Sequence, residues 1–117
     1  MVTPEFAERF AQHWVAAWNA HDLEKILSHY TPDFEMVSPY IVQITEQASG
    51  KLRGKAAVGA YWSMALDKMP HLHFDLISVL VGIDSVVINY HGARGLASEV
   101  FYFDDAGLVV RACAHYA

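Results

Sequence analysis

The sequence predicts an α+β fold, with helices in the first part of the chain and an antiparallel sheet in the second. Large apolar residues recur at helical spacing as far as residue 69, and from residue 71 onward the apolar period changes to two. A chain that places its helices before its strands packs those helices on one face of a curved sheet. Because the chain has 117 residues and is 54% hydrophobic, we expect a single domain over residues 1–117.

The first helix is expected over residues 4–18. Thr3 is a hydroxyl N-cap, and Pro4 occupies the first helical position. Large rings then recur every four residues and therefore share one face of the helix: Phe6, Phe10, Trp14 and Trp18. A short second helix, capped by Asp22, is expected over residues 23–29.

The middle of the chain predicts a strand and a third helix. A turn at residues 31–33 ends the second helix, and residues 34–38 fit a strand that stops at Pro39, which cannot donate a ladder hydrogen bond. Residues 40–47 fit either an edge strand or an ordered loop. The third helix is predicted over residues 55–69, where apolar residues again fall at core spacing.

The last part of the chain predicts an antiparallel meander. The apolar alternation gives four strands, over residues 71–81, 85–92, 97–103 and 108–116. Each connection between them is short and contains Gly, which is typical of hairpins. Three successive hairpins therefore make up the larger part of the sheet.

Charge and cysteine content exclude several classes of protein. A net charge of −5 argues against binding to nucleic acid or to an anionic membrane, since both require clustered Lys and Arg. Cys113 is the only cysteine, so no intrachain disulfide can form. The N-terminus lacks a basic segment followed by an apolar run, and no stretch reaches the roughly 18 apolar residues of a membrane span. We therefore expect a soluble cytoplasmic protein.

Three stretches carry a resemblance to a known superfamily. The helix pair in "FAERFAQHWVAAWNAHDLEKILSHYTPDFEMVSP", the helix start "LRGKAAVGAYW" and the closing hairpin "EVFYFDDAGLVVRACAHY" together resemble the nuclear transport factor 2-like superfamily. The resemblance runs from Phe6 to Tyr116 and is strongest to its SnoaL-like and ketosteroid isomerase-like bacterial members. It implies a cone in which three helices and a bent mixed sheet enclose an apolar pocket.

The resemblance also implies a homodimer through the outer face of the sheet. The sequence itself also favours a dimer, because the strands "FDLISVLV" and "VVINY" are apolar on both faces. Helices cover only one of these faces, so the other needs a partner, and a symmetric dimer is the simplest one.

The resemblance implies three catalytic positions, of which the chain retains one. The carboxylate base of the ketosteroid isomerases corresponds to Ser38, and a serine without an activating partner is a poor base. Their oxyanion tyrosine corresponds to Trp14, whose indole donates one hydrogen bond but cannot shuttle a proton. Glu99 alone matches the family's buried carboxylic acid on the penultimate strand.

Glu99 is therefore the main catalytic candidate. It alternates with Phe101 and Phe103 on one face of a strand, where burial would raise its pKa. A carboxyl in such a place is either a neutral hydrogen-bond donor or a base near neutral pH. The alternative is a carboxylate that is paired with Arg94 or Arg111, or that is exposed at the start of a strand.

His91 is the second catalytic candidate. It precedes the turn at residues 92–95, so the hairpin brings it toward Glu99, although the register of the two strands is undetermined. A His and a Glu in one apolar pocket would form an acid/base couple. The alternative is a surface histidine near a turn.

The sequence indicates no cofactor and no metal. The stretch "GKAAVGA" lacks the glycine spacing of phosphate and dinucleotide sites, so we expect cofactor-free chemistry. His71, His73 and Asp75 share a strand face, but adjacent positions on that face lie about 7 Å apart, which is wide for three ligands of one ion. A solvated start of the strand is the preferred interpretation.

The aromatic content predicts an aromatic pocket. Three Trp, six Tyr and six Phe are more than tight packing of so small a domain requires. The expected lining residues are Trp14, Trp18, Tyr30, Phe34, Met36, Ser38, Tyr61, Trp62, Met64, Phe101 and Tyr116. Such a pocket suits a flat hydrophobic ligand of aromatic or polycyclic type.

Two functions fit these residues. The first is a small-molecule enzyme, such as an isomerase, cyclase or hydratase, that moves protons on a hydrophobic carbonyl compound through Glu99 and His91. The second is a non-catalytic domain that binds a hydrophobic metabolite in the same pocket. The serine at position 38 favours the second hypothesis, and the retention of Glu99 favours the first.

Overall fold

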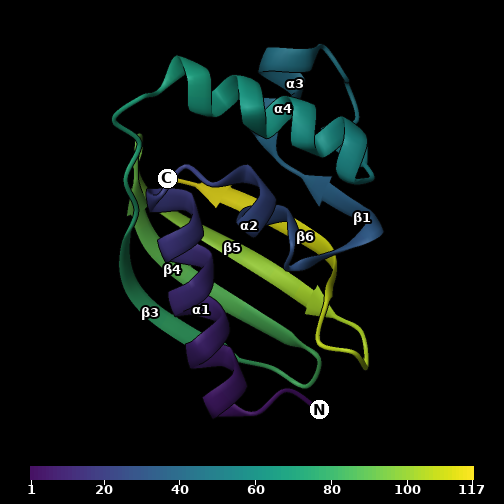
Figure 1. Cartoon of the computed structure of the whole chain (residues 1–117), viewed down its shortest axis with the longest axis vertical. Helices are drawn as coiled ribbons and strands as arrows, with labels where there is room; N and C mark the ends of the chain where they lie inside the picture. The colour runs from purple at the N-terminus through teal and green to yellow at the C-terminus, as the bar shows by residue number, and fades with distance from the viewer.

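The computed structural model describes all 117 residues and confirms the expected α+β fold (Figure 1). It contains four helices where three were predicted. The elements run in the order α1 (Pro4–Asn19), α2 (Leu23–Leu27), β1 (Tyr30–Val37), α3 (Pro39–Thr45), β2 (Lys51–Arg53), α4 (Lys55–Lys68), β3 (Asp75–Val81), β4 (Ser85–Gly92), β5 (Gly95–Phe103) and β6 (Val109–Tyr116). No helix is long and apolar enough to cross a membrane.

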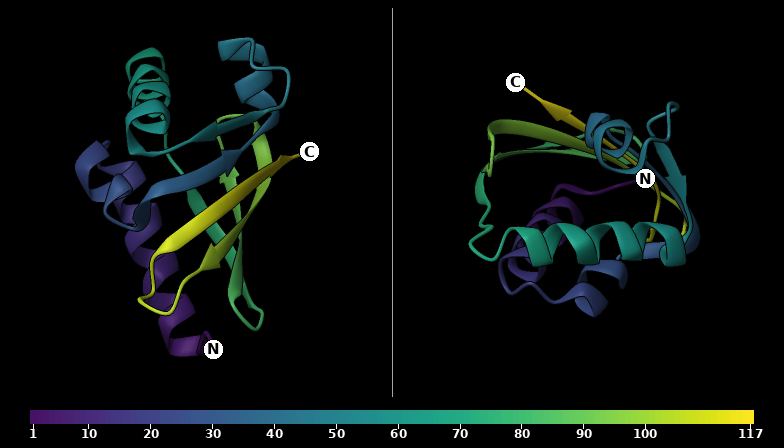
Figure 2. Two further views of the ribbon diagram at one scale, coloured as in Figure 1. Left: turned by 90° about the vertical axis from the view of Figure 1, so that its right-hand side faces the viewer. Right: turned by 90° about the horizontal axis from the view of Figure 1, so that it is seen from above.

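The six strands form one mixed sheet in the order β2-β1-β6-β5-β4-β3. Neighbouring strands run antiparallel except β1 and β6, which run parallel. The sheet bends strongly, and α1, α2 and α4 lie on its concave side (Figure 2). The result is a cone, with α1 beginning at one end while α3 and α4 lie across the other (Figure 1).

Phenylalanine rings fill the end of the cone where α1 begins. Phe10 packs edge-to-face on Phe101 and on Phe103, with ring centroids 4.9 Å apart in both pairs. Phe6 contacts Phe103 in the same way at 5.1 Å. Pairs of this geometry add about 0.5–1.5 kcal/mol to the free energy gained from burial. These four residues are called the closed end below.

The segment after Pro39 forms α3, whereas an edge strand or a loop was expected. Ser38 is its N-cap, because the Ser38 hydroxyl accepts a hydrogen bond from the backbone N–H of Tyr40 at 3.2 Å. Pro39 occupies the first position of the helix, where a missing N–H costs nothing. The helix places Tyr40 against Tyr116 of β6, with the two rings stacked at 4.1 Å.

β1 begins at Tyr30, so the turn predicted at residues 31–33 is wrong. Its pairing with β6 is interrupted between Tyr30 and Glu35, where the register shifts. Pro32 lies inside this irregular stretch and can be accommodated there, because a bulged position does not need its N–H for the ladder.

The strand predicted from residue 71 begins at Asp75 instead. The Asn19 side chain, at the end of α1, accepts from the Phe74 N–H at 2.7 Å and donates to the Phe74 carbonyl at 3.0 Å. His21 Nε2 lies 2.9 Å from the carbonyl oxygen of Leu72. These backbone groups therefore bond to α1 and its C-terminal turn, not to a neighbouring strand.

Candidate functional site

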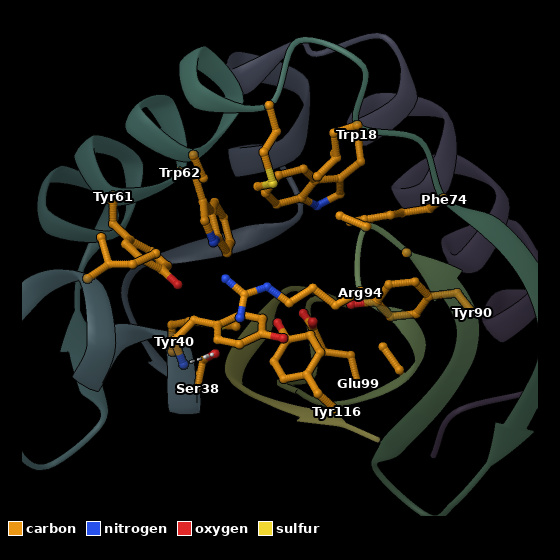
Figure 3. A pocket seen from close by; sticks show the side chains of 18 of the residues that line it. Trp18, Ser38, Tyr40, Tyr61, Trp62, Phe74, Tyr90, Arg94, Glu99 and Tyr116 are labelled. Carbon is orange, nitrogen blue, oxygen red and sulfur yellow. Dashed lines mark hydrogen bonds between the residues drawn. The ribbon is translucent and has the colours of Figure 1, made fainter.

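A cavity opens at the end of the cone covered by α3 and α4 (Figure 3). It has a volume of about 120 Å³, and fifteen of its twenty lining residues are hydrophobic. Its walls are rings from α1, α4, the residue before β3 and β4: Trp14, Trp18, Tyr61, Trp62, Phe74 and Tyr90. This region is called the open end below. A mostly apolar lining with a few polar groups is typical of a small-molecule site, although the volume is below the roughly 300–1,000 Å³ usual for drug-sized ligands.

Seven of the eleven residues expected to line the pocket do so: Trp14, Trp18, Met36, Ser38, Tyr61, Trp62 and Tyr116. Tyr30, Phe34 and Phe101 do not, because each is at most 1% exposed and is enclosed by other core side chains. Met64 lies on the exposed side of α4. The sequence reasoning missed Tyr40, Phe74, Tyr90 and Arg94.

Glu99 reaches the cavity from the middle of β5. It is 4% exposed and is paired in register with Ile88 of β4 and Ala114 of β6. It takes part in none of the ion pairs of the chain. Arg111, one of its two expected partners, instead bonds Glu35, with Nε 3.0 Å from Oε1. The charge of Glu99 is therefore not balanced by a salt bridge.

Burial raises the pKa of Glu99 to about 8, and the Tyr90 hydroxyl opposes this shift only in part. Burial also raises the pKa of Tyr30, Tyr61 and Tyr116, and the nearby Glu99 carboxyl adds to that effect. The phenol groups around Glu99 consequently remain protonated and available as hydrogen-bond donors. At neutral pH the carboxyl itself is mostly protonated.

His91 does not meet Glu99, so the expected acid/base couple is wrong. Gly92 pairs with Gly95 across a two-residue turn, and this register sets His91 opposite Leu96. His91 is exposed, and the alternation of the strand turns Tyr90 toward the cavity in its place. The two turn residues, Ala93 and Arg94, are not the Gly, Asn or Asp typical of two-residue hairpin turns, so the sequence alone did not give this register.

Arg94 occupies the turn between β4 and β5 and lies at the mouth of the cavity. Its guanidinium carbon is 4.1 Å from the centroid of the Tyr40 ring. Figure 3 shows the side chain extended across the mouth toward Tyr61 and Trp62. Arg94 was expected to pair with Glu99, yet it forms no ion pair. Its turn position gave no sign that it would face a cavity.

Trp14 and Trp18 differ in how their indole N–H groups are used. Trp14 Nε1 donates to the hydroxyl of Tyr30 at 3.0 Å. Trp18 Nε1 is buried and has no hydrogen-bond partner. In Figure 3 it lies on the edge of the indole ring that faces the cavity. A buried donor without a partner costs about 1–3 kcal/mol, so its orientation calls for an acceptor.

Comparison with known proteins assigns the family. Residues 11–117 match the model of the SnoaL-like domain. The chain belongs to the SnoaL-like domain family. A crystal structure of a SnoaL-like protein of unknown function from Burkholderia thailandensis is 57% identical, with a TM-score of 0.97 over 99% of this chain and 98% of that one.

More distant structures share the SnoaL-like fold at low identity. TerC, co-crystallised with polyporic acid, gives a TM-score of 0.75 at 18% identity over 96% of this chain and 92% of TerC. A cystatin-like protein from Methylobium petroleophilum gives 0.77 at 18% identity over 99% of this chain and 78% of that one. No curated protein matches the sequence.

In this SnoaL-like chain, Ser38 serves the structure of the site and not as a base. It is 2% exposed, and its hydroxyl caps α3. The same hydroxyl favours the ionised form of Tyr61 and Tyr116 and so opposes in part the rise in pKa that burial causes in each phenol. The lining contains no imidazole, and its one carboxyl, that of Glu99, makes no hydrogen bond with the Ser38 hydroxyl, so Ser38 has no activating base in contact with it. Glu99 is the only acidic residue of the lining.

The stretch "HLHFD" does not assemble a metal site. His73 Nε2 lies 3.3 Å from Asp75 Oδ1, and both side chains are more than half exposed. The structure contains no group of three His, Cys, Asp or Glu residues that could hold a metal ion.

Proposed function

We propose that this domain catalyses proton transfer on a flat hydrophobic carbonyl compound, with Glu99 as the group that takes and returns the proton. The family supports the broader statement that the protein is a small-molecule enzyme or a binding domain. The observation that supports proton transfer is the buried carboxyl of Glu99, which has no cationic partner and faces an aromatic cavity. Titratable groups with strongly raised pKa values gather at active sites.

Glu99 can act as a base because its pKa lies close to physiological pH. With a pKa of about 8, roughly a tenth of the carboxyl groups are ionised at pH 7. The ionised form would remove a proton from the carbon next to the substrate carbonyl and leave an enolate. It would then return that proton to the same or to a conjugated carbon, so no cofactor is consumed.

The hydroxyls near Glu99 would stabilise the enolate. Tyr90 and Tyr116 are protonated donors in a cavity of low polarity, where a hydrogen bond to a developing oxyanion is strong. Trp18, Trp62 and Phe74 would hold the rings of the substrate by stacking. The co-crystallisation of TerC with a small organic acid supports a small-molecule ligand for this fold.

Hydrogen exchange in deuterium oxide tests the proposal without knowledge of the natural substrate. The probe is 2-tetralone, a flat ketone, and NMR follows the loss of its α-proton signals. We expect the wild type to accelerate exchange over buffer and Glu99→Gln to reduce this acceleration by about 10²–10⁴-fold. Glu35→Gln, which alters a carboxylate paired with Arg53 and Arg111 and not in the cavity lining, is the matched control.

A non-catalytic binding domain is the second candidate, and the position of Ser38 favours it. The hydroxyl there caps α3 and supplies no base. Under this candidate, 2-tetralone would quench the tryptophan fluorescence of the wild type while its α-protons exchange no faster than in buffer. Equal exchange rates for the wild type and Glu99→Gln would likewise rule out the catalytic proposal.

The homodimer through the outer sheet face stays a prediction. Leu80 and Leu96 face outward on β3 and β5 and are 57% and 51% exposed, which supports a buried partner for this face. Sedimentation velocity of the chain would give the mass of a monomer if the prediction is wrong.

A further inference from the structure

Arg94 is the only cationic side chain that lines the cavity. It sits in a two-residue turn between Gly92 and Gly95, and Gly95 has a φ of 98°, a conformation that favours glycine. A turn this short leaves the backbone little freedom, so the direction in which Arg94 leaves the hairpin is fixed by β4 and β5. That direction leads across the mouth of the cavity (Figure 3).

The guanidinium of Arg94 is held in place by rings and is not neutralised. It lies over Tyr40, which itself stacks on Tyr116 with the ring centroids 4.1 Å apart. Its charge also reaches the phenol of Tyr61, where it favours the ionised form and lowers the pKa against the effect of burial. No carboxylate lies within ion-pair distance. A guanidinium stacked in this way keeps its five N–H groups free for a planar acceptor.

The charges lining the cavity do not cancel at neutral pH. Glu99 is the only acidic lining residue, and its pKa of about 8 leaves it mostly protonated at pH 7. The tyrosines of the lining with raised pKa values, Tyr61, Tyr90 and Tyr116, are neutral as well. The cavity therefore carries a net charge close to +1, located at its mouth, and this charge attracts a single anionic group.

The interior of the cavity suits a different part of the ligand from the part that binds at its mouth. Trp18, Trp62 and Phe74 form an apolar wall suited to a ring system. The unpartnered Nε1 of Trp18 lies at this wall and can donate to one oxygen of such a ring system. A ligand that satisfies both regions is anionic at one end, flat and apolar in the middle, and carries one acceptor further in.

We infer that the ligand of this cavity is an amphipathic carboxylate, in which a flat ring system fills the interior and the carboxylate binds the guanidinium of Arg94. The pair would be bidentate, since the planar fork of arginine matches the two oxygens of a carboxylate. This inference specifies the substrate class of the proposed function and uses the same cavity. Among ligands of the same shape, it predicts that a carboxylate binds more tightly than its neutral or cationic analogue.

Isothermal titration calorimetry with two probes of the same shape tests the charge preference. The probes are 6-hydroxy-2-naphthoate and its amide, 6-hydroxy-2-naphthamide, which differ in charge but hardly in size. We expect the wild type to bind the carboxylate at least about tenfold more tightly at pH 7, a ratio typical of a charged hydrogen-bonded pair. Added salt should reduce that ratio, because the mouth is open to solvent.

Variants of Arg94 identify the group responsible. Arg94→Gln should bring the affinities for the two probes to within about threefold of each other, and Arg94→Lys should give an intermediate ratio, because it keeps the charge without the fork. Arg53→Gln removes a cation bonded to Glu35 outside the cavity and should leave the ratio as in the wild type. Circular dichroism would establish that each variant is folded.

Several outcomes would overturn the inference. One is an amide that binds the wild type as tightly as the carboxylate, and another is a carboxylate preference that survives in Arg94→Gln. Absence of carboxylate binding at about 1 mM would also overturn it, since that limit corresponds to less than about 4 kcal/mol of binding free energy. The probes undergo no reaction, so these results are independent of whether Glu99 exchanges protons on 2-tetralone.

Discussion

The two ends of the cone contain the same kinds of side chain but use them differently. At the closed end, Phe10 packs against Phe101 and Phe103 with ring centroids 4.9 Å apart in both pairs, and none of these rings lines the aromatic cavity. At the open end, Trp18 and Trp62 are also in contact, at 5.3 Å, yet they border a cavity. Strand β5 crosses from one region to the other, because Glu99 lines the cavity and Phe101, two residues later, is part of the closed end.

The comparison shows that ring content alone does not distinguish a core from a binding site. The two are distinguished by whether the polar atoms among the rings have hydrogen-bond partners. At the boundary, Trp14 and Tyr30 satisfy each other with a hydrogen bond of 3.0 Å. At the open end, the Trp18 N–H and the Glu99 carboxyl have neither a full set of partners nor contact with bulk water. A ligand in the cavity would explain why these two groups are left without partners.

The largest expected effect is a pH dependence of stability that belongs to the open end. The pKa of Glu99 is about 8 in the folded protein against 4.5 for the unperturbed group. The folded state therefore holds the proton more tightly, and its contribution is complete below pH 4.5 and is lost as the pH rises to about 8. The slope approaches about 1.4 kcal/mol per pH unit in this window.

Urea denaturation at several pH values measures this effect. We expect Glu99→Gln to be more stable than the wild type at pH 8, by an amount that shrinks toward zero near pH 4.5, where the wild-type carboxyl is protonated in both states. A constant difference between the two proteins over this range would show that Glu99 titrates normally and would place it in contact with water.

A matched pair of substitutions on α1 next compares an indole N–H that has a hydrogen-bond partner with one that has none. Trp14→Phe removes the donor to Tyr30, leaves that buried hydroxyl without its partner and creates a small cavity, which together cost roughly 2–4 kcal/mol. Trp18→Phe removes the same ring volume but a donor that has no partner, so its loss should be smaller than that of Trp14→Phe by about 1–3 kcal/mol. Urea titrations followed by circular dichroism give both values, and equal losses would contradict the distinction.

The smallest expected change in stability comes from making the open end resemble the closed end. Ala65 lies on α4 and lines the cavity, and Ala65→Leu would place a larger side chain in that space. Leucine is a good helix former, so the free energy of unfolding should change by less than about 1 kcal/mol. Binding of 6-hydroxy-2-naphthoate should weaken by at least about tenfold, since the ligand and the side chain compete for one volume. Unchanged binding would show that the ligand lies elsewhere.

The helices show how far the sequence could predict the fold. Thr3-Pro4 predicted the start of α1 through an N-cap followed by proline, and the Thr3 hydroxyl accepts from the backbone of Phe6 at 3.1 Å. Ser38-Pro39 has the same form and starts α3, but the proline was interpreted as the end of a strand. The sequence signal for α3 was therefore present. It was missed because Pro39 was interpreted by the rule that proline ends a strand.

Other features depended on contacts that no local pattern contains. The segment before β3 alternates like a strand, yet Asn19 and His21, more than fifty residues away, bind its backbone. Glu99 could be assigned to an aromatic strand face, since strand alternation is local. The absence of a cationic partner for Glu99 could not be predicted, because it depends on the ion pair that Arg111 makes with Glu35 on the other face of the sheet. The position of Arg94 at the mouth of the cavity could not be predicted either, because it depends on the contact with the distant Tyr40.

The N-cap of α3 has an implication for how new activities can arise in this scaffold. Ser38 both starts the helix and projects its hydroxyl among the phenols of the cavity. Aspartate caps a helix as well as serine does, and its charge is favoured at a helix N-terminus. A change from Ser38 to Asp would therefore introduce a carboxylate opposite Glu99 while the backbone around it remains supported. At this position, chemistry and folding impose compatible requirements, so selection can alter the reaction without first rebuilding the wall that contains it.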